Sequence, residues 1–370
     1  MENMVTMLDT LFNTYKGKKV FLTGHTGFKG SWMLKMLKLL GADVTGFSLA
    51  PLTKDDLYYL ISGGEICQSI IGDIRHAQTL KQAIIDSDPD FVFHLAAQPL
   101  VRLSYEIPSE TFEVNAIGTA NLLDGVRALK KRCNVVLITT DKVYYNNEWE
   151  YPYRESDRLG GYDPYSASKA CAELVISSYV NSFFNPINYQ THQKAVAVGR
   201  AGNVIGGGDW SLDRLIPDIA RALIQQNEVV IRNPSSVRPW QHVLEPLTGY
   251  LLLGAKLQQD PNKYAQPYNF GPYAEDALPV LSMVNLAIKC WGSGSYYLPE
   301  LLNQPHEAGL LKLDISKAVA QLGWKPRFNA QKAVDYTIEW YKQFAENRDN
   351  IDTFTEDQIK FFLKLGEGQI

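Results

Sequence analysis

The chain has 370 residues, of which 45% are hydrophobic, and its formal net charge is −4. This length and apolar content suffice for two domains, or for one domain with a large appendage. Positive and negative residues are mixed throughout, so no basic stripe indicates nucleic acid and no lysine run indicates a membrane surface. No apolar run approaches the ~18 residues that span a bilayer.

The N-terminal stretch carries Glu2 and Asp9 and lacks a long apolar core, so it does not resemble a signal peptide. The six histidines show no HxH or HExxH spacing, which argues against a metal site. Four scattered cysteines without a CxxC pair predict reduced thiols in a cytoplasmic protein: Cys67, Cys133, Cys171 and Cys290.

The first half of the chain alternates strand-like and helix-like segments. We expect short apolar strands at 19–23, 44–49, 69–72, 91–95 and 135–139, and helices at 31–40, 111–131 and 166–182. This alternation is typical of βαβ units. It predicts an α/β fold with a Rossmann-type, doubly wound parallel sheet.

After about residue 200, glycine, proline and aromatic residues become dense and the alternation fades. We interpret this part as a smaller, mixed α/β C-terminal domain that binds the substrate, with the chain returning to the sheet near 237–257. The Rossmann domain would then comprise 1–198 and about 234–262, and the substrate domain 199–233 and about 263–370. The charged, amphipathic pattern of residues 351–370 predicts an appended helix.

A glycine-rich GxxGxxG turn joins the first predicted strand to the first predicted helix. Glycines let the backbone approach a pyrophosphate, and the helix N-terminus offers free N–H groups. We therefore expect a dinucleotide to contact the turn and the end of the fourth strand, through Gly24, Thr26, Gly27, Phe28, Lys29, Gly30, Leu95, Ala96 and Ala97.

The second strand ends in Gly46-Phe47-Ser48, without the acid that usually bonds the ribose 2′-hydroxyl of NAD. No arginine is present there for a 2′-phosphate either, so we favour NAD over NADP as the cofactor. Asp73, followed by Ile74, ends the third strand and is a candidate for the adenine side. The alternative is that Asp73 caps the next helix.

Tyr165 and Lys169 form a YxxxK pair, and a helix from Ser166 onward would place them on one face. Lys169 would then favour the phenolate of Tyr165 and make it a usable base. Thr140, Asp141 and Lys142 follow a buried strand at the edge of the sheet where ligands bind. The alternative for Tyr165 and Lys169 is an ordinary exposed pair. The alternative for the residues after the strand is a loop whose polar side chains are solvated.

Several segments together resemble the extended short-chain dehydrogenase/reductase family over nearly the whole chain: GHTGFKGSW, HLAAQPLVRLSY, TTDKVY, GGYDPYSASK, RAGNVIGGGDWSLDRLIPD and RPWQHVLEP. Within it they are similar to the nucleotide-sugar 4,6-dehydratases that act on CDP-glucose. Relatives acting on dTDP-glucose carry Asp-Glu where this chain has Asp141-Lys142. Val143 and the stretch at 185–193 depart from the pattern of the branch.

The resemblance implies an NAD-dependent hydro-lyase that converts CDP-glucose to CDP-4-keto-6-deoxyglucose in deoxysugar and O-antigen biosynthesis. Tyr165 would take the proton of the 4-hydroxyl, beside Thr140, while C4 is oxidised. Asp141 would protonate the departing 6-hydroxyl, and Lys142 would act as base at C5 or stabilise an enolate as a cation. Hydride would return to C6, so that water alone is lost.

Arginines are expected to hold the nucleotide diphosphate. Arg238 and Asn203 match the family's phosphate-contacting residues, and Arg214 is a candidate on the same loop, with surface solvation as the alternative. Gln98, Arg102, Ser104 and Tyr105 would line the sugar side. Asn115 is expected to order the active-site backbone.

The family commonly dimerises through the helices expected at 111–131 and 166–182, so a homodimer is expected. The apolar run NLLDGVRAL is equally compatible with packing on the chain's own sheet. A nucleotide-sugar 4-epimerase of the same fold is the main alternative function, although epimerisation needs no acid–base pair at C5 and C6. A non-catalytic NAD-binding protein is another, although such proteins often lose the tyrosine or the lysine.

Overall fold

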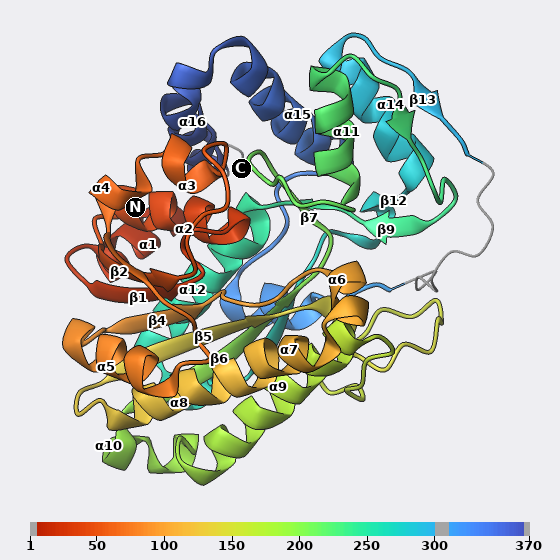
Figure 1. Cartoon of the computed structure of the whole chain (residues 1–370). Helices are drawn as coiled ribbons and strands as arrows, with labels where there is room; N and C mark the ends of the chain where they lie inside the picture. The colour runs from red at the N-terminus through yellow and green to blue at the C-terminus, as the bar shows by residue number, and fades with distance from the viewer. Residues whose placement is uncertain (1–5, 300–310, 366–370) are drawn as a thin grey trace, which may run out of the picture.

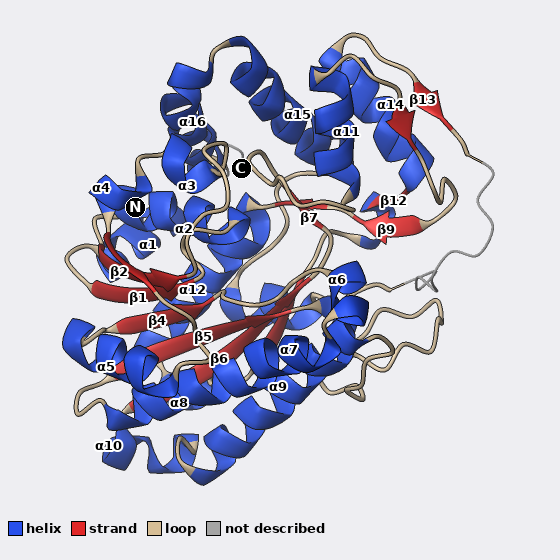
Figure 2. Ribbon diagram, in the orientation of Figure 1, coloured by secondary structure: helices blue, strands red, loops and turns tan. Residues whose placement is uncertain are grey.

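The computed structural model describes residues 6–299 and 311–365. A seven-stranded parallel sheet forms its centre (Figure 2). In spatial order the strands are β11 (Pro267–Phe270), β6 (Lys194–Ala201), β5 (Cys133–Thr139), β4 (Phe91–His94), β1 (Lys19–Thr23), β2 (Asp43–Ser48) and β3 (Gln68–Ile71). The strand order reverses between β1 and β4, which creates the crevice where ligands bind in such sheets. The predicted fold class is confirmed.

Helices cover both faces of this sheet, with α1 (Met7–Tyr15), α2 (Phe28–Leu39) and α12 (Leu244–Gln259) on one face and α5 (Ala77–Ser87), α8 (Gly118–Ala128) and α9 (Pro164–Ser182) on the other (Figure 1). The middle of strand β1 consists of three consecutive apolar residues, Val20 to Leu22. Val20 and Leu22 point into the first core, whereas Phe21 points into the second. Both faces of the strand are buried, as in other parallel sheets.

The helix expected at 111–131 is divided into three parts. A short helix α7 (Pro108–Phe112) leads into a π-helical segment η1 (Glu113–Ile117), which continues as α8. Asn115 lies inside the π-helical segment and is buried. Single π-helical turns are frequent at functional sites, and here the turn directs Asn115 towards the loop that follows β4.

The segment with which the chain returns to the sheet near 237–257 is mainly a helix, α12. Helix α12 packs its apolar side chains against β5 and β6, and its 16 residues exceed the usual length of a strand. The strand that follows is β11, which lies beside β6 within the range predicted for the second domain. The division into two domains stays a prediction.

The remainder of the second half forms a cap at the upper right of Figure 1. It contains α11 (Leu215–Ile224), α14 (Val280–Trp291), α15 (Ala330–Glu346) and three two-stranded pairings among β7 (Val204–Ile205), β8 (Val229–Val230), β9 (Val237–Pro239), β10 (Gln241–His242), β12 (Ala277–Pro279) and β13 (Tyr296–Tyr297). Short helices α3 (Leu57–Leu60), α4 (Gly63–Ile66), α6 (Val101–Glu106), α10 (Tyr189–His192) and α13 (Pro261–Tyr264) complete the architecture, together with a π-helical segment η5 (Ala318–Leu322) and short 3-10 turns.

The helix expected at the C-terminal end is observed as α16 (Ile351–Lys364), while residues 366–370 lie outside the described residues. Lys35 of α2 forms ion pairs with Asp352 and Glu356, so α16 is attached to the helix that follows the glycine turn. Within the described ranges, every helix is too short or too polar to cross a bilayer.

Candidate active site

The glycine turn closes tightly between β1 and α2. Gly24 has a φ of 76°, and a Cβ atom there would lie 2.8 Å from the backbone nitrogen of Ala96. A Cβ atom at Gly30 would lie only 1.9 Å from the carbonyl oxygen of Gly24. Gly27 is the N-cap of α2 and provides no side-chain hydrogen bond, so the first N–H groups of the helix can receive an anion. This geometry fits a dinucleotide pyrophosphate.

The ends of β2, β3 and β4 surround this turn. The hydroxyl groups of Thr26 and Ser48 bond each other at 2.8 Å. The carboxylate of Asp73 accepts hydrogen bonds from the backbone N–H and from the guanidinium of Arg75. The bond from the guanidinium lowers the pKa of this carboxyl. Helix α5 begins after His76, so Asp73 is not its cap and that alternative was wrong. Ile74 is buried.

After β4, the segment at 95–97 follows the turn closely, and the backbone N–H of Ala96 donates to the hydroxyl of Thr23 at 3.2 Å. The side-chain amide of Gln98 is engaged within the loop: its nitrogen donates to Thr111 and Leu100, and its oxygen accepts from Leu100. Gln98 therefore supports this loop, and its N–H groups are not available to a sugar.

Helix α9 presents Tyr165 and Lys169 at the carboxyl edge of the sheet. Asp163 caps the helix, and the hydroxyl of Ser104 accepts the backbone N–H of Tyr165 at 3.1 Å. Lys169 donates to the carbonyl of Ile138 at 3.0 Å. Ser104 thus positions the backbone of Tyr165 rather than facing outward, since its side chain is fully buried.

Burial dominates the protonation of this pair. It raises the pKa of Tyr165 to about 12, although a hydrogen bond with Thr140 and the charge of Arg214 act in the opposite direction. Burial also lowers the pKa of Lys169 to about 8, against the nearby charge of Glu173. In the resting protein Tyr165 therefore holds its proton near neutral pH.

Thr140 and Asp141 lie directly beside Tyr165. The hydroxyl of Thr140 donates to Asp141 Oδ1 at 2.8 Å, and Asn203 Nδ2 donates to Asp141 Oδ2 at 3.4 Å. Both Thr140 and Asp141 are buried. Lys142 bonds Thr140 through its backbone N–H, and its ammonium makes no hydrogen bond or ion pair with any residue of the described ranges.

A buried network that the sequence analysis missed supports Lys169. Glu173, one turn further along α9, holds Arg200 in a bidentate pair at 2.8 and 2.9 Å. The same carboxylate accepts the hydroxyl of Thr139 at 2.6 Å, and Arg200 also donates to Tyr144. The spacing of Glu173 from Lys169 on a predicted helix was the available signal.

The loop after β6 brings cap residues to the same place. A Cβ atom at Gly202 would lie 2.0 Å from Asp141 Cγ, so only glycine leaves room for this carboxylate. Asn203 has a φ of 51°, in the left-handed region, and reaches Asp141 from there. Asp209 pairs with Arg214 at 3.0 Å, and the charge of Arg214 acts on Tyr165.

The loop at 206–210 is fixed by aromatic residues from distant parts of the chain. Trp32 of α2 donates to the carbonyl of Gly207 at 2.9 Å, while Trp340 of α15 covers this glycine so closely that a Cβ atom would lie 2.0 Å from its ring. Tyr341 donates to the carbonyl of Asp209 at 2.6 Å. These contacts place Asp209 and, through it, Arg214.

Lys29 of the glycine turn also faces this cluster. Burial, together with the charges of Arg214 and Lys169, lowers the pKa of Lys29 to about 8, and the charges of Asp141 and Asp209 act in the opposite direction. Arg102 of α6 forms an ion pair at 3.3 Å with Asp213, which lies in the loop between β7 and α11.

Arg238 lies on β9 and donates to the carbonyl of Val237 at 3.0 Å. Asn115 bonds Gln98 and Ser168, as expected for a residue that orders the backbone.

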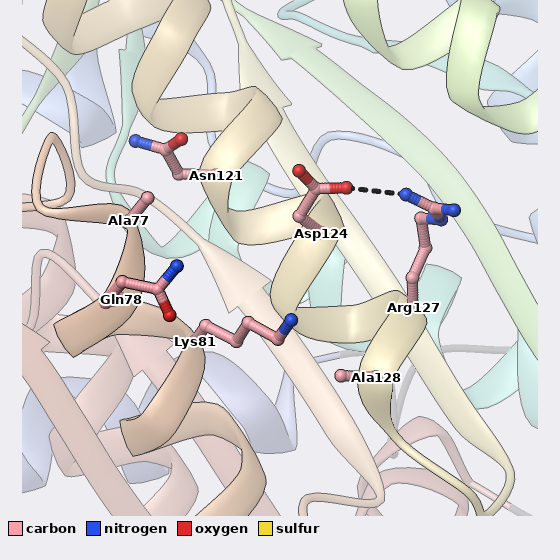
Figure 3. Close-up of a pocket in the computed structure, with 7 residues that line it drawn as sticks. All are labelled: Ala77, Gln78, Lys81, Asn121, Asp124, Arg127 and Ala128. Atoms are coloured by element: carbon pink, nitrogen blue, oxygen red, sulfur yellow. Dashed lines mark hydrogen bonds and ion pairs between the residues drawn. The ribbon is translucent and has the colours of Figure 1, made fainter.

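A shallow hollow elsewhere on the surface lies between α5 and α8, on the helical layer rather than at the carboxyl edge of the sheet (Figure 3). It is lined by Ala77, Gln78, Lys81, Asn121, Asp124, Arg127 and Ala128. Asp124 and Arg127 pair with each other across one helical turn. Among the described residues, no group of three or more histidine, cysteine or acidic side chains is arranged to hold a metal ion.

Comparison with known proteins agrees with this geometry. The family model described as GDP-mannose 4,6 dehydratase matches residues 21–337. A CDP-glucose 4,6-dehydratase of Salmonella typhimurium is 49% identical over 91% of this chain and 94% of the relative. A UDP-glucose 4-epimerase of Mycoplasma pneumoniae is 24% identical over 88% of this chain and 97% of the relative.

Among solved structures, a double mutant of the dTDP-glucose 4,6-dehydratase of Streptomyces venezuelae, with NAD bound, has a TM-score of 0.75. It is 22% identical and covers 90% of this chain and 99% of its own, so this likeness shows the fold. The family resemblance predicted from the motifs is confirmed by the family model and by the relative of 49% identity. On this evidence the chain belongs to the GDP-mannose 4,6 dehydratase family.

Proposed function

We propose that this protein catalyses the NAD-dependent 4,6-dehydration of CDP-glucose to CDP-4-keto-6-deoxyglucose. The observation that carries the proposal is the 49% identity, over 91% of the chain, with a CDP-glucose 4,6-dehydratase. The contacts among Tyr165, Thr140 and Asp141 support it, because the reaction needs a proton acceptor at O4 and a proton donor at O6 within reach of one sugar.

The proposed roles follow from position. Tyr165 takes the proton of the 4-hydroxyl beside Thr140, and Lys169 supports it electrostatically. Asp141 protonates the departing 6-hydroxyl. Lys142 is the candidate base at C5, a role that requires its neutral amine, or a cation that stabilises the enolate, a role that requires its ammonium.

NAD, when bound, would supply a reversible acceptor for the hydride that moves from C4 to C6. We assign its pyrophosphate to the turn at 24–30, its adenine side to Asp73 and Ile74, and its remaining contacts to 95–97, Tyr165 and Lys169. The uncapped N-terminus of α2 supports this assignment.

For the diphosphate of the substrate we propose Asn203, Arg214 and Arg238, with Arg102 near the sugar. Arg214 is supported by its place in the cluster around Tyr165. Gln98 and Ser104, predicted to line the sugar, are better explained as supports of the loop and of Tyr165, because their side chains are engaged with protein groups.

We also propose a homodimer formed through η1–α8 and α9. The predicted apolar run on α8 is used within the subunit, since Leu122, Leu123 and Val126 are fully buried. Ile117 and Leu174, however, are 54% and 61% exposed on these helices and could meet a second copy.

A cytoplasmic location and a place in deoxysugar and O-antigen biosynthesis rest on the substrate assignment.

The test is to incubate the protein and NAD with CDP-, dTDP-, UDP- and GDP-glucose and to follow the mass of each product. We expect loss of one water from CDP-glucose alone. An unchanged mass with inverted configuration at C4 would instead indicate a 4-epimerase, and loss of water from another nucleotide sugar would contradict the choice of cytosine.

A further inference from the structure

A hydroxyl group occupies the place at the end of β2 where a Rossmann fold usually carries a carboxylate. Ser48 is the last residue of β2, one position beyond Phe47, which pairs with Thr23 at the end of β1. At this point of the fold an acid commonly bonds the 2′-hydroxyl of the adenosine ribose of NAD. The residue is only 8% exposed, so neighbouring protein groups determine what its hydroxyl can offer to a ligand.

Two hydrogen bonds of the neighbouring Thr26 fix the direction of the Ser48 hydroxyl. Thr26 donates its hydroxyl proton to the carbonyl oxygen of Leu49 at 2.8 Å. Thr26 and Ser48 also share a hydrogen bond of 2.8 Å between their hydroxyl oxygens. A hydroxyl has a single proton, so Thr26 accepts in this second bond and Ser48 donates. The result is a directed chain that runs from Ser48 through Thr26 to Leu49.

This chain leaves the hydroxyl oxygen of Ser48 as an acceptor. Its proton is committed to Thr26, and no donor among residues 6–299 and 311–365 bonds the oxygen. A hydroxyl held in this way has a free lone pair and no free proton, which is also the hydrogen-bonding pattern of a carboxylate oxygen. It suits a ligand group that donates a proton, such as a ribose hydroxyl.

We propose that Ser48, oriented by Thr26, selects NAD over NADP in this protein. Its oxygen accepts the hydrogen bond of the ribose 2′-hydroxyl, whereas a 2′-phosphate would meet an oxygen with no proton to give. The proposal rests on the NAD dependence of the dehydration proposed above. It states how the cofactor is chosen without the usual acid.

The nearby arginine on the adenine side is already neutralised by the protein. Residues 46–53 contain no arginine or lysine, so a 2′-phosphate would need a cation from elsewhere. Arg75, which follows β3, forms ion pairs with Asp73 at 2.6 Å and with Glu110 at 3.0 Å. Binding of a phosphate by Arg75 would therefore break existing pairs.

Lys54 is the first basic residue after β2, and its backbone is fastened to the cap. The carbonyl oxygen of Lys54 accepts from Arg348 at 2.8 Å, and that of Asp55 accepts from Trp210 at 2.8 Å. Asp56 folds the same turn by accepting backbone N–H groups of 52 and 53. The carboxylates of Asp55 and Asp56 offset the charge of Lys54, so this segment offers no excess of positive charge.

The first experiment measures dissociation constants by calorimetry and is therefore independent of turnover. The wild type and Ser48→Ala are titrated with NAD, with NADP and with 2′-deoxy-NAD, which lacks the 2′-hydroxyl of the adenosine ribose. We expect the wild type to bind NAD about fivefold more tightly than 2′-deoxy-NAD, the effect of one neutral hydrogen bond. It should bind NAD at least about 10²-fold more tightly than NADP, because polar groups are left unpaired.

Ser48→Ala should bind NAD and 2′-deoxy-NAD with equal affinity, since the acceptor of the 2′-hydroxyl is removed. If this variant still distinguishes the two ligands as the wild type does, Ser48 is not the acceptor and the proposal is overturned. Thr53→Val is the matched control, because it removes a hydroxyl of the same loop that bonds Asp56 instead. All three dissociation constants should remain at their wild-type values in Thr53→Val.

The second experiment compares Thr26→Val, which keeps the shape but removes the hydroxyl, with Thr26→Ser, which keeps it. Without the Thr26 oxygen, Ser48 can turn its proton towards a phosphate. The ratio of NADP to NAD affinity should therefore rise about tenfold in Thr26→Val, the effect of one regained hydrogen bond to a charged group. It should stay near the wild-type ratio in Thr26→Ser. Equal ratios in both variants would contradict the orienting role of Thr26.

Melting temperatures establish that each variant is folded. If the wild type dehydrates CDP-glucose but binds 2′-deoxy-NAD as tightly as NAD, the role of Ser48 alone is wrong. If it prefers NAD as expected but leaves CDP-glucose unchanged, the proposed function fails and the role of Ser48 stands. If it binds neither NAD nor NADP, both fail together.

Discussion

The two sides of the candidate site are held by different forces. On the sheet side, Tyr165 and Lys169 of α9 lie over a buried polar network in which Glu173 and Arg200 form a bidentate ion pair. On the cap side, the loop at 202–214 is placed by glycines packed against aromatic rings and by single bonds to backbone carbonyls. This difference predicts that sheet-side changes cost stability as well as activity, whereas cap-side changes mainly cost activity.

The largest effect is expected on the sheet side. Tyr165→Phe removes the group that exchanges the proton of O4, and turnover of CDP-glucose should fall about 10²–10⁴-fold. NAD affinity should change little, since the turn at 24–30 is untouched. A steady-state assay with an NAD titration checks this, and turnover that remains near the wild-type level would exclude Tyr165 as the base.

Glu173→Gln tests the buried network directly. It leaves the charge of Arg200 without its partner in a site that is 3% exposed, and should lower the free energy of unfolding by about 3–5 kcal/mol. Because the charge of Glu173 raises the pKa of Lys169, its loss should also move that pKa below about 8. Denaturant unfolding measures the first effect. A change under 1 kcal/mol would remove the contrast between the two sides.

Gly202→Ala tests the cap side. The added methyl group would overlap Asp141, whose Cγ lies 2.0 Å from the position of the new Cβ. Displacement of the carboxylate by about 1 Å should lower turnover about 10²-fold. Gly64→Ala is a control for an added Cβ at a glycine that, like Gly202, does not have a positive φ, because its Cβ would meet only Tyr58 Oη, at 3.6 Å. Equal activity in the two variants would show that Asp141 tolerates displacement.

The smallest effect is expected from Tyr341→Phe, which removes the hydrogen bond to the carbonyl of Asp209. The unpaired carbonyl should cost about 1 kcal/mol of stability and raise the KM for CDP-glucose through the looser placement of Arg214. Thermal unfolding and substrate titration measure these two quantities. A raised KM without a change in turnover would fit a binding role for Arg214, and an unchanged KM would contradict it.

The sequence was sufficient for features that depend on neighbouring residues. The glycine turn follows from three glycines at the start of a helix, and the approach of Tyr165 to Lys169 follows from their spacing. The position of Asp141 at the edge of the sheet follows from the strand before it. Each of these is determined within about one helical turn or one strand.

Features that depend on distant residues were not predictable in this way. Gln98 has the composition of a sugar-binding residue, but Thr111 and Asn115 engage it in the fold. The contact of Gly202 with Asp141 joins the ends of two strands, and that of Tyr341 with Asp209 spans 132 residues. The return of the chain to the sheet near 237–257 was predicted without the type of element, because an apolar run alone does not distinguish a buried helix from a strand.

The contact at Gly207 has a consequence for the way the molecule melts. Trp32 reaches this glycine from the helix of the cofactor turn, and Trp340 reaches it from the C-terminal half. Both tryptophans are fully buried in one continuous core that also contains residues of the cap. Unfolding of either half would expose buried side chains of the other half to water. Calorimetry should therefore record one cooperative unfolding transition rather than two.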